Sequence, residues 1–446
     1  MRLLLLLVIG GLMHAARSFA PQPGVGSEPG GVALACGYLL LSAFLAGSLV
    51  KAIGLPKLTG YIATGIIVGP QVLDLVSHSM VDELRIFNGV AIALIALTAG
   101  TEMEFRSMRP LFRTIGWITG VAVIGTTLML SGLVYLCRGL LPFMSELTLI
   151  QAVAVSVVLG VVMVAQSPAV VVALRDETDA DGPVSRTVLG VVVISDLVVI
   201  VLFALVSTAT KALFGADSDA VQTAGMLTWE IFGSGIAGAM VAALLAVYLR
   251  KVRGGGALFV VTVAFVVAEV GQRIHFDPLI VALTAGILIR NLTEMGERLH
   301  HEIEAASLPV YVAFFAVTGA TIHLDALMVV GLPAALFVVV RGAGLLTGTR
   351  IATQLAGAPN PVKRFAGFGL LPQAGLALAL ALLFTRAFPT FGREASALVL
   401  SVVAINEIVA PVLYRLALIR SGEAGQRSNE KAKMSAGEDI VEATAS

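Results

Sequence analysis

Charged side chains are scarce in this sequence. Asp, Glu, Lys and Arg together make up 13% of its 446 residues, whereas hydrophobic residues make up 57%. A soluble domain usually carries about a quarter charged residues. Because the deficit extends along almost the whole chain, the composition argues against a soluble protein and indicates an all-α polytopic membrane protein. The 29 basic and 29 acidic residues leave no net charge, which argues against a nucleic-acid partner.

Cysteine is also rare, and several chemical motifs are missing. Cys36 and Cys137 both lie in apolar runs, so the sequence contains neither a disulfide framework nor a metal-ligand spacing. No Gly-rich phosphate loop follows a strand-like run, and no His/Glu metal motif or nucleophile and base pair is visible. We therefore expect a protein that is not an enzyme and has no bound cofactor.

The first twenty residues differ from the rest of the chain. After a basic start, an apolar run extends from Leu3 to Met13, and a small-x-small ending closes the segment at Ala20. This run is shorter than the ~20 residues that a spanning helix needs. We therefore expect a signal peptide at 1–20 rather than a first spanning helix. Cleavage would leave a short external segment at 21–31.

Beyond residue 31, long apolar runs alternate with short polar breaks. We expect about thirteen transmembrane helices within residues 32–419. A disordered cytoplasmic tail, rich in Glu, Lys, Ser and Gly, is expected at 420–446. The spans are placed near 32–50, 58–76, 86–100, 114–136, 149–174, 184–206, 228–249, 257–272, 277–290, 309–322, 326–349, 365–385 and 395–419.

The distribution of Lys and Arg predicts the orientation in the membrane. If the mature N-terminus is external, twenty of these residues fall in loops and in the tail on the cytoplasmic side, and six fall in external breaks. Cytoplasmic loops of membrane proteins carry an excess of basic residues. We therefore expect a cell inner (plasma) membrane protein whose mature N-terminus is outside and whose C-terminus is cytoplasmic.

The two halves of the chain resemble each other in four places. The matched residues are separated by 204 to 221 positions in the chain. A separation of this size corresponds to a unit of about six spans followed by one linking span, so the repeats should run inverted in the membrane. Inverted repeats with interrupted helices are typical of secondary transporters, whose site lies at the midplane. A channel or a repetitive membrane enzyme is the alternative. The matched pairs are Gly65 with Gly286, Gly100 with Gly319, Pro168 with Pro372, and Asp196 with Glu407.

Two prolines interrupt matching apolar runs. Pro168 follows Gln166 and Ser167 in one expected span, and Pro372 precedes Gln373 in another. A break inside a membrane leaves backbone groups unpaired, which is tolerated where they line a cavity or face each other. Two opposed breaks would bring oppositely charged helix ends to the midplane. The alternative is a simple proline kink at each position.

Asp196 and Arg341 are the two deep charges. Asp196, in VVVISDLVVIVLF, lies about twelve residues into its span, near mid-bilayer at 1.5 Å per residue. An ionised carboxylate there costs ~2.5–3.5 kcal/mol, so a functional role is the default interpretation. A permanently protonated or structurally paired Asp196 is the alternative. Arg341 cannot carry a proton but can offset negative charge, or it is a snorkelling or structural cation.

Four further acidic residues are weaker candidates. Glu269 lies nearer an external end and can be solvated, whereas Glu407 follows Asn406 inside the last span. Glu102 and Glu104 lie at the cytoplasmic end of the third span. We interpret these residues as structural partners or as part of an ion entry route.

Five segments together resemble the monovalent cation:proton antiporters. The similarity is to the proton antiporter-2 group, which includes bacterial Na⁺/H⁺ exchangers and Kef-type K⁺/H⁺ systems, and it extends over residues 32–419. The segments are GLPKLTGYIATGIIVGP (54–70), AQSPAVVVAL (165–174), RTVLGVVVISDLVVIVLFAL (186–205), FFAVTGATIHL (314–324) and GLLPQAGLALAL (369–380).

The resemblance implies a fold and a set of site residues. The implied fold has thirteen helices in inverted repeats, with two interrupted crossing helices and a core domain that moves against a dimerisation domain, usually in a homodimer. Asp196 matches the ion-binding aspartate of the family. Gln166, Ser167 and Pro168 match the unwound stretch of the first crossed helix, and the Pro372 region matches the second. Arg341 falls where many relatives have a lysine.

The sequence departs from the family pattern in three respects. Ser195 stands where relatives usually have Asn, Asp or Gln, and Gln166-Ser167 replaces a Thr-Asp or Thr-Ser pair. No nucleotide-binding domain follows the last span, which argues against a ligand-gated Kef-type system.

Together these features predict a secondary active antiporter for a monovalent cation and protons. Asp196 would bind either a proton or the cation, while Ser195 contributes a hydroxyl oxygen but no second charge. One titratable carrier predicts electroneutral exchange. The residues do not decide among Na⁺, K⁺ and Li⁺. A cation channel and a sodium-coupled organic-solute symporter of similar architecture are the alternatives.

Overall fold

Every regular secondary-structure element in the part of the chain that its computed structural model describes is a helix, and that part contains no strand. The described residues are 2–19, 31–84, 86–214, 225, 229–252, 254–274, 276–322, 324–373 and 375–427. In chain order the helices are α1 (Arg2–Phe19), α2 (Val32–Ala52), α3 (Lys57–Val68), α4 (His78–Leu84), α5 (Ile86–Glu102), α6 (Phe105–Met108), α7 (Phe112–Ile118), α8 (Ile124–Leu136), α9 (Leu149–Val164), α10 (Pro168–Thr178), α11 (Pro183–Leu213), α13 (Ser234–Lys251), α14 (Gly256–Ile274), α15 (Pro278–Leu292), α16 (Gly296–Ala320), α17 (Leu324–Ala356), α18 (Asn360–Phe365), α19 (Gly375–Ala387) and α20 (Gly392–Ser421). A π-helical turn, η2 (Thr119–Val123), joins α7 to α8, and a 3-10 turn, η6 (Ala366–Leu370), follows α18.

An all-helical membrane fold is confirmed, whereas the number of spans stays a prediction. Within the described ranges, nine helices are long and apolar enough to cross a membrane, or ten if the bent pair formed by α18–η6 and α19 is one span. Three other expected spans coincide with the shorter apolar helices α3, α14 and α15. The expected span at 309–322 is part of a longer helix, since α16 already begins at Gly296.

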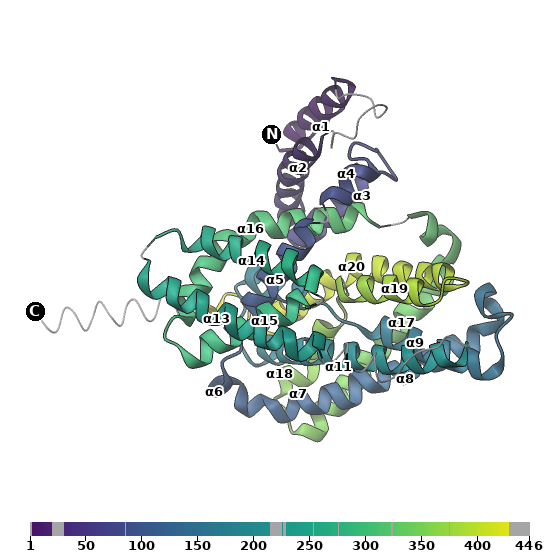
Figure 1. Cartoon of the computed structure of the whole chain (residues 1–446). Coiled ribbons are helices and arrows are strands. Elements are labelled where there is room, and N and C mark those ends of the chain that lie inside the picture. Colours follow the sequence, from purple (N-terminus) through teal and green to yellow (C-terminus); the bar gives the residue numbers. More distant parts are fainter. Residues whose placement is uncertain are drawn as a thin grey trace, which may run out of the picture.

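The helices form two bundles (Figure 1). In the first bundle, α5 packs against α14, α15 and α16, and α3 packs against α2 and α16. In the second, α9 packs against α8 and α11, while α17 and α19 pack against α20. The main contacts between the bundles are α10 against α5 and α20 against α3. The first bundle therefore combines helices from both halves of the chain, and so does the second.

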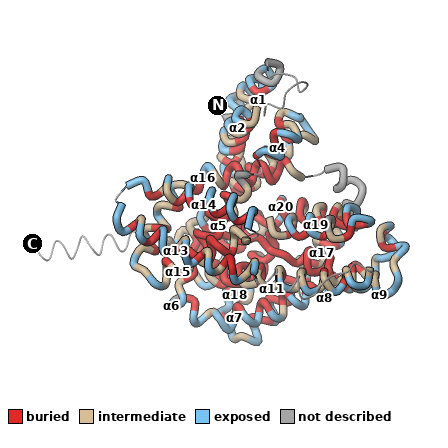
Figure 2. Tube along the Cα trace, viewed as in Figure 1, coloured by how far each residue is buried: buried red, intermediate tan, exposed pale blue. Residues whose placement is uncertain are grey.

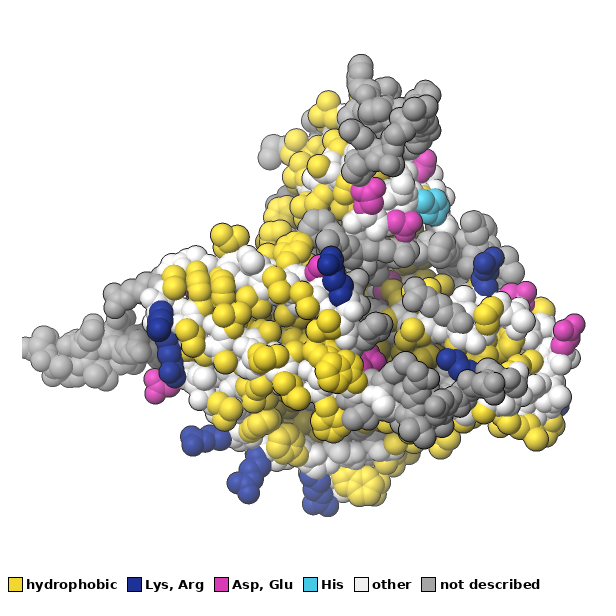
Figure 3. All heavy atoms as spheres, viewed as in Figure 1, with side chains coloured by type: hydrophobic (Ala, Val, Ile, Leu, Met, Phe, Trp, Pro, Cys, Tyr) yellow, Lys and Arg dark blue, Asp and Glu magenta, His cyan; other side chains and the backbone are white. Residues whose placement is uncertain are grey.

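The distribution of side chains fits a protein surrounded by lipid. Buried residues gather where the two bundles meet (Figure 2). Hydrophobic side chains are spread widely over the face seen in Figure 3, and several Lys and Arg side chains lie along its left and lower edges. Leu128 on α8 is 65% exposed and Leu258 on α14 is 74% exposed. Lipid tails solvate such side chains, so their exposure has no cost in a bilayer.

The structure at the two ends of the chain can be compared with the expected domain boundaries. The expected signal peptide coincides with α1, which packs against α2, and its cleavage stays a prediction. Most of the expected external segment lies outside the described residues, as does 428–446 of the expected tail. The boundary expected at 420 falls inside α20, and the next residues, through Arg427, contact the bundles.

Candidate functional site

The chain is interrupted between α9 and α10, at residues 165–167. Ser167 has an extended backbone, and its hydroxyl accepts a hydrogen bond from the amide N–H of Val170 at 3.2 Å. Pro168 is the first residue of α10, where a backbone N–H would have no partner within the helix, so its absence costs nothing. The proline ring also disfavours a helical conformation at the preceding residue, Ser167. Ser167 therefore serves as the N-cap of α10. The side-chain amide of Gln166 is buried and has no hydrogen-bond partner among the described residues.

A second interruption lies between η6 and α19, around Pro372. The segments on its two sides are bent by 42°. Elsewhere, Pro309, Pro333 and Pro411 lie inside continuous helices. Pro168 and Pro372 therefore mark true breaks, whereas the other three prolines are accommodated within helices.

Gln373 joins the two breaks directly. Its side-chain Nε2 donates to the carbonyl oxygen of Met163, at the end of α9, at 2.8 Å. Its Oε1 accepts a hydrogen bond of 2.7 Å from Nδ2 of Asn406 on α20. Gln373 and Asn406 are both buried, so these bonds are shielded from solvent. The two interrupted helices therefore meet at this point.

Arg341 neutralises the carbonyl groups that both breaks leave without partners. It is fully buried on α17. Its guanidinium donates to Met163 O at 2.8 Å, to Ala165 O at 3.1 Å, to Leu371 O at 2.7 Å and to Leu370 O at 3.4 Å. Each helix C-terminus carries about half a negative charge, so two such ends match one guanidinium. The sequence predicted a compensating charge at Arg341, and its observed partners are these four carbonyls.

Asp196 is the fourteenth residue of α11 and has no exposed surface. Neither of its carboxylate oxygens has a hydrogen-bond partner among the described residues, and the same is true of the hydroxyl of Ser195. Helix α11 packs against α9, η6 and α19, which flank the two breaks. The structure thus places a carboxylate that has no hydrogen-bond partner within the described part of the chain on a helix that packs against both broken helices.

One acidic residue near Asp196 was missed in the sequence. Asp277 lies close enough to Asp196 for the two carboxyl groups to interact electrostatically. Its Oδ1 accepts hydrogen bonds from the amides of Leu279, at 2.7 Å, and Ile280, at 3.4 Å, which makes it the N-cap of α15. The Asp-Pro pair at the start of an apolar run could have identified this helix start.

The weaker acidic candidates lie in different surroundings. Glu269 is half exposed and pairs with Arg273 one helical turn away at 2.7 Å, so it forms a surface ion pair. Glu407 is 2% exposed, and its Oε1 has no hydrogen-bond partner among the described residues. Glu102 and Glu104 lie in a charged hollow at the opposite end of α5 from Ile86.

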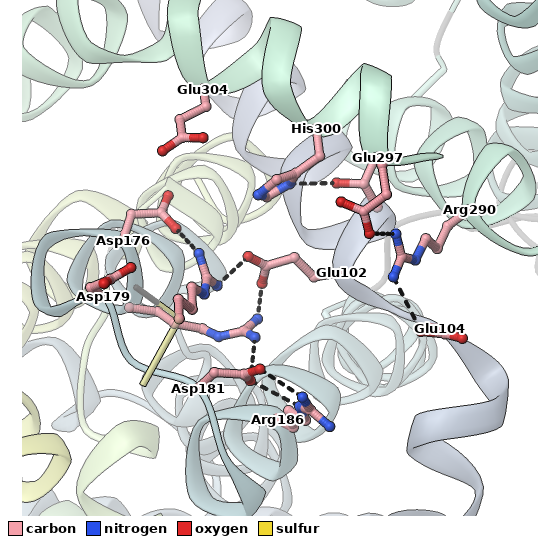
Figure 4. Close-up of a pocket in the computed structure, with 13 residues that line it drawn as sticks. Glu102, Glu104, Asp176, Asp179, Asp181, Arg186, Arg290, Glu297, His300 and Glu304 are labelled. Carbon is pink, nitrogen blue, oxygen red and sulfur yellow. Dashed lines mark hydrogen bonds and ion pairs between the residues drawn. The ribbon is translucent and has the colours of Figure 1, made fainter. Parts of the chain in front are cut away.

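That hollow, with a volume of about 1170 Å³ including its opening, lies where α5, α10, α15 and α16 present their charged ends (Figure 4). Glu102 on α5 pairs with both Arg175 on α10 and Arg427 beyond α20, and thereby connects the two bundles. The hollow is lined by Thr101, Glu102, Glu104, Arg175, Asp176, Asp179, Asp181, Arg186, Arg290, Glu297, His300, Glu304 and Arg427.

Asp181, in the turn between α10 and α11, is held by two arginines. It pairs with Arg175 at 2.9 Å and with Arg186 at 2.6 Å. Burial alone would raise the pKa of this carboxyl group, but the hydrogen bond from Arg186 and the two positive charges lower its pKa to about 2. Asp181 is therefore ionised at any physiological pH.

The residues that follow α20 complete this region. Both carboxylate oxygens of Glu423 accept hydrogen bonds from the first turn of α11, from Val184 N at 2.6 Å and from Ser185 N at 2.8 Å. The amide of Gly425 donates to the carbonyl of Thr178 at 3.0 Å. The negative charge of Glu423 also suits the N-terminus of the helix that carries Asp196. Sequence reasoning missed these contacts because they join residues far apart in the chain.

Comparison with known proteins supports this architecture. Residues 40–419 match the family described as sodium/hydrogen exchanger, transmembrane. The chain is 27% identical over 179 residues to the iron transporter MagA of Paramagnetospirillum magneticum, across 40% of this chain and 38% of that protein. It is 27% identical over 288 residues to the probable Na(+)/H(+) antiporter GerT of Bacillus cereus, across 63% of this chain and 71% of that protein.

Solved structures show the same fold at low sequence identity. The sodium proton antiporter MjNhaP1 from Methanocaldococcus jannaschii at pH 8 superposes with a TM-score of 0.62 and 17% identity, over 87% of this chain and 95% of its own. A second structure of MjNhaP1 gives a TM-score of 0.64 and 16% identity, over 87% of this chain and 97% of its own. Since the family match covers most of the chain, this protein belongs to the transmembrane sodium/hydrogen exchanger family.

Proposed function

We propose that this protein exchanges a monovalent cation for a proton across the membrane, with Asp196 as the shared carrier. The observation that carries the proposal is the carboxylate of Asp196, which is buried without a hydrogen-bond partner among the described residues. Its helix packs against the elements around two broken helices whose carbonyl groups Arg341 neutralises. The family match and the similarity to an antiporter fold support cation/proton antiport.

Coupling follows from the cost of a bare carboxylate. An ionised, unpaired carboxylate in a low-dielectric interior costs several kcal/mol, whereas a protonated or cation-bound carboxylate is close to neutral. The site therefore moves between the two faces only when Asp196 is loaded. Because a proton and a cation compete for the same oxygens, inward movement of one is coupled to outward movement of the other.

We infer that the second bundle moves against the first. The two breaks, Arg341 and Asp196 all belong to the second bundle, which is tied together by buried hydrogen bonds. Its main contacts with the first bundle are those of α10 with α5 and of α20 with α3. Displacement of the second bundle as a rigid unit would carry Asp196 from one face of the membrane to the other.

Two helix crossings support an inverted repeat. Helix α5 crosses α15 where a Cβ added to Gly100 would lie 2.9 Å from the Cα of Gly286. Helix α3 crosses α16 where a Cβ added to Gly65 would lie 2.8 Å from the amide nitrogen of Ala320, next to Gly319. In the sequence, Gly65 matches Gly286 and Gly100 matches Gly319. If each residue of the α3–α16 contact is replaced by its match in the other half of the chain, the residues of the α5–α15 contact result.

We propose that exchange is electroneutral, with one proton for each monovalent cation. Ser195 stands beside Asp196 and has no charge, and Arg341 is committed to carbonyl groups. The carboxylate of Asp277 already accepts two amide hydrogen bonds as a helix cap. Asp196 therefore remains the single carrier, and Na⁺ or K⁺ is the exchanged cation.

The remaining expectations about location and assembly belong to the same proposal. The excess of Lys and Arg on one side supports an inner membrane protein whose mature N-terminus is outside and whose C-terminus is cytoplasmic. In this orientation the charged hollow around Glu102 opens to the cytoplasm. We expect a homodimer, as the family resemblance implies.

The decisive experiment is ion-driven proton movement in proteoliposomes. Outward gradients of Na⁺, K⁺ or Li⁺ should move protons, without any organic solute, against a pre-existing proton gradient and without generating a membrane potential. Asp196→Asn should abolish this movement because an amide cannot exchange a proton for a cation. Glu146→Gln, at an exposed carboxylate, is the matched control and should retain activity. Transport retained by Asp196→Asn would overturn the proposal, and a membrane potential would overturn electroneutrality.

A further inference from the structure

A second buried carboxylate faces a small cavity between the two bundles. Glu407 is the sixteenth residue of α20 and lines this cavity together with Thr318 and Thr321 from the end of α16. The other lining residues are Ile322, Leu378, Leu400, Val403 and Ala404. Since α16 belongs to the first bundle and α19 and α20 to the second, the cavity lies on the boundary between the bundles.

Among the described residues, no side chain that lines this cavity neutralises Glu407. Its Oε1 has no hydrogen-bond partner, and no other charged side chain lines the cavity, among the residues that the structure describes. The neighbouring Asn406 is already bonded to Gln373 and to the carbonyl of Val402. A bare carboxylate in such surroundings costs several kcal/mol. Glu407 must therefore carry either a proton or a bound cation while the cavity is closed.

The cavity also offers suitable ligands for a cation. It has room for one guest of the size of a water molecule. The hydroxyl of Thr321 donates its hydrogen to the carbonyl of Thr318 at 2.7 Å, which leaves the lone pairs of the Thr321 oxygen available. Carboxylate and hydroxyl oxygens are hard ligands, as a hard cation prefers. One carboxylate balances the charge of one monovalent cation.

We propose that Glu407, with Thr318 and Thr321, forms a second site at which one monovalent cation competes with a proton. The sequence pairs ISDLV around Asp196 with INEIV around Glu407, so the two sites occupy matching positions in the two halves of the chain. Glu407 shares its cavity with side chains from the end of α16 in the first bundle. Occupancy of this site therefore depends on the relative position of the bundles and in turn stabilises one position over the other.

The site can be tested by equilibrium binding, without transport. NaCl or KCl is added to purified full-length protein in weakly buffered detergent solution, with choline chloride as the ionic-strength control, and proton release is measured with a pH dye. In Asp196→Asn, which removes the first site, cation-dependent proton release should persist. In Asp196→Asn/Glu407→Gln it should disappear. Size-exclusion chromatography and thermal unfolding establish that both proteins are folded.

Two further variants keep the test independent of folding defects. Glu407→Asp should retain proton release because the carboxylate is kept. Thr321→Val removes a hydroxyl ligand but keeps the proton-binding carboxylate. It should raise the cation concentration for half-maximal proton release at least about tenfold, the lower end of the loss seen when a supporting residue is removed at a metal site.

The outcomes separate this inference from the proposed exchange. The second site is contradicted if Asp196→Asn shows no cation-dependent proton release, or if Asp196→Asn/Glu407→Gln releases as many protons as Asp196→Asn. Either result counts against the second site even if Asp196→Asn has lost transport as proposed. Transport retained by Asp196→Asn overturns the proposed role of Asp196 and leaves the binding test of Glu407 intact.

Discussion

Nε of Arg341 donates a hydrogen bond to the carbonyl oxygen of Met163 at 2.8 Å, although 178 residues separate them in the chain. Met163 lies in the last turn of α9, where carbonyl groups have no partner within the helix. The guanidinium of Arg341 bonds in the same way to Leu371 in the second break. One side chain therefore stabilises the ends of two helices from different halves of the protein.

Replacing Arg341 should destabilise the protein and stop transport. Arg341→Met leaves buried carbonyl groups unsatisfied, and each buried acceptor without a partner costs about 1–3 kcal/mol. Arg341→Lys should be intermediate because lysine keeps the charge with fewer donors. Thermal unfolding in detergent measures the effect, and Arg350→Met, at an exposed position of the same helix, is the control. Equal melting temperatures for Arg341→Met and Arg350→Met would contradict the role of Arg341.

Gln373 should contribute to stability because its hydrogen bonds join the two breaks. Gln373→Ala removes its hydrogen bonds to Met163 and Asn406 and leaves both partners buried. The free energy of unfolding should fall by about 1–3 kcal/mol. Gln354→Ala, at an exposed position on α17, changes the same side chain without loss of a buried contact. If both variants unfold at the same temperature, the contact between the two breaks does not depend on this side chain.

The close approach of α5 and α15 should not tolerate a larger residue at Gly100. A Cβ there would lie 2.5 Å from the carbonyl oxygen of Leu283 and 2.9 Å from the Cα of Gly286, so the helices would have to separate. We expect Gly100→Ala to lower the melting temperature, with a cost of about 1–3 kcal/mol for overpacking. Gly125→Ala on α8, where a Cβ meets open space, should be nearly neutral. Unchanged stability of Gly100→Ala would show that these helices are not packed as described.

Asp181 should make stability depend on acid pH. Its folded-state pKa of about 2 lies below the ordinary value of 3.8, so its ion pairs stabilise the folded protein above pH 4. This stabilisation, about 2 kcal/mol, is lost as the pH falls through 2. Melting temperatures measured between pH 2 and 7 should show Asp181→Asn less stable than the unsubstituted protein near neutrality. The difference should shrink at the acid end, and a difference independent of pH would contradict the assignment.

Parts of this structure were predictable from sequence and others were not. The helices could be predicted because a membrane-spanning segment must be apolar over most of its length. Helix α16 shows the limit: its first half contains Glu297, His300 and Glu304, which line the charged hollow, so hydropathy places the span at 309–322 only. Polar side chains on a helix that faces a hollow are indistinguishable from a loop in a hydropathy profile.

The site was predictable as a set of residue types but not as a geometry. Asp196, Arg341, Glu407 and the two prolines stand out because a charge or a break in an apolar run requires a reason. Their hydrogen-bond partners do not stand out in the sequence, since the carbonyl groups bonded by Arg341 belong to ordinary apolar residues.

The sequence by itself determined that this chain is helical, lies in a membrane and carries a deep carboxylate, because each of these depends on local hydrophobicity and charge. Only the tertiary structure decided that the two breaks meet, that Arg341 serves their carbonyl groups and not Asp196, and that Glu407 faces a cavity on the bundle boundary. Contacts of this kind arise from how distant helices pack, and the geometry of packing is not encoded in any single segment.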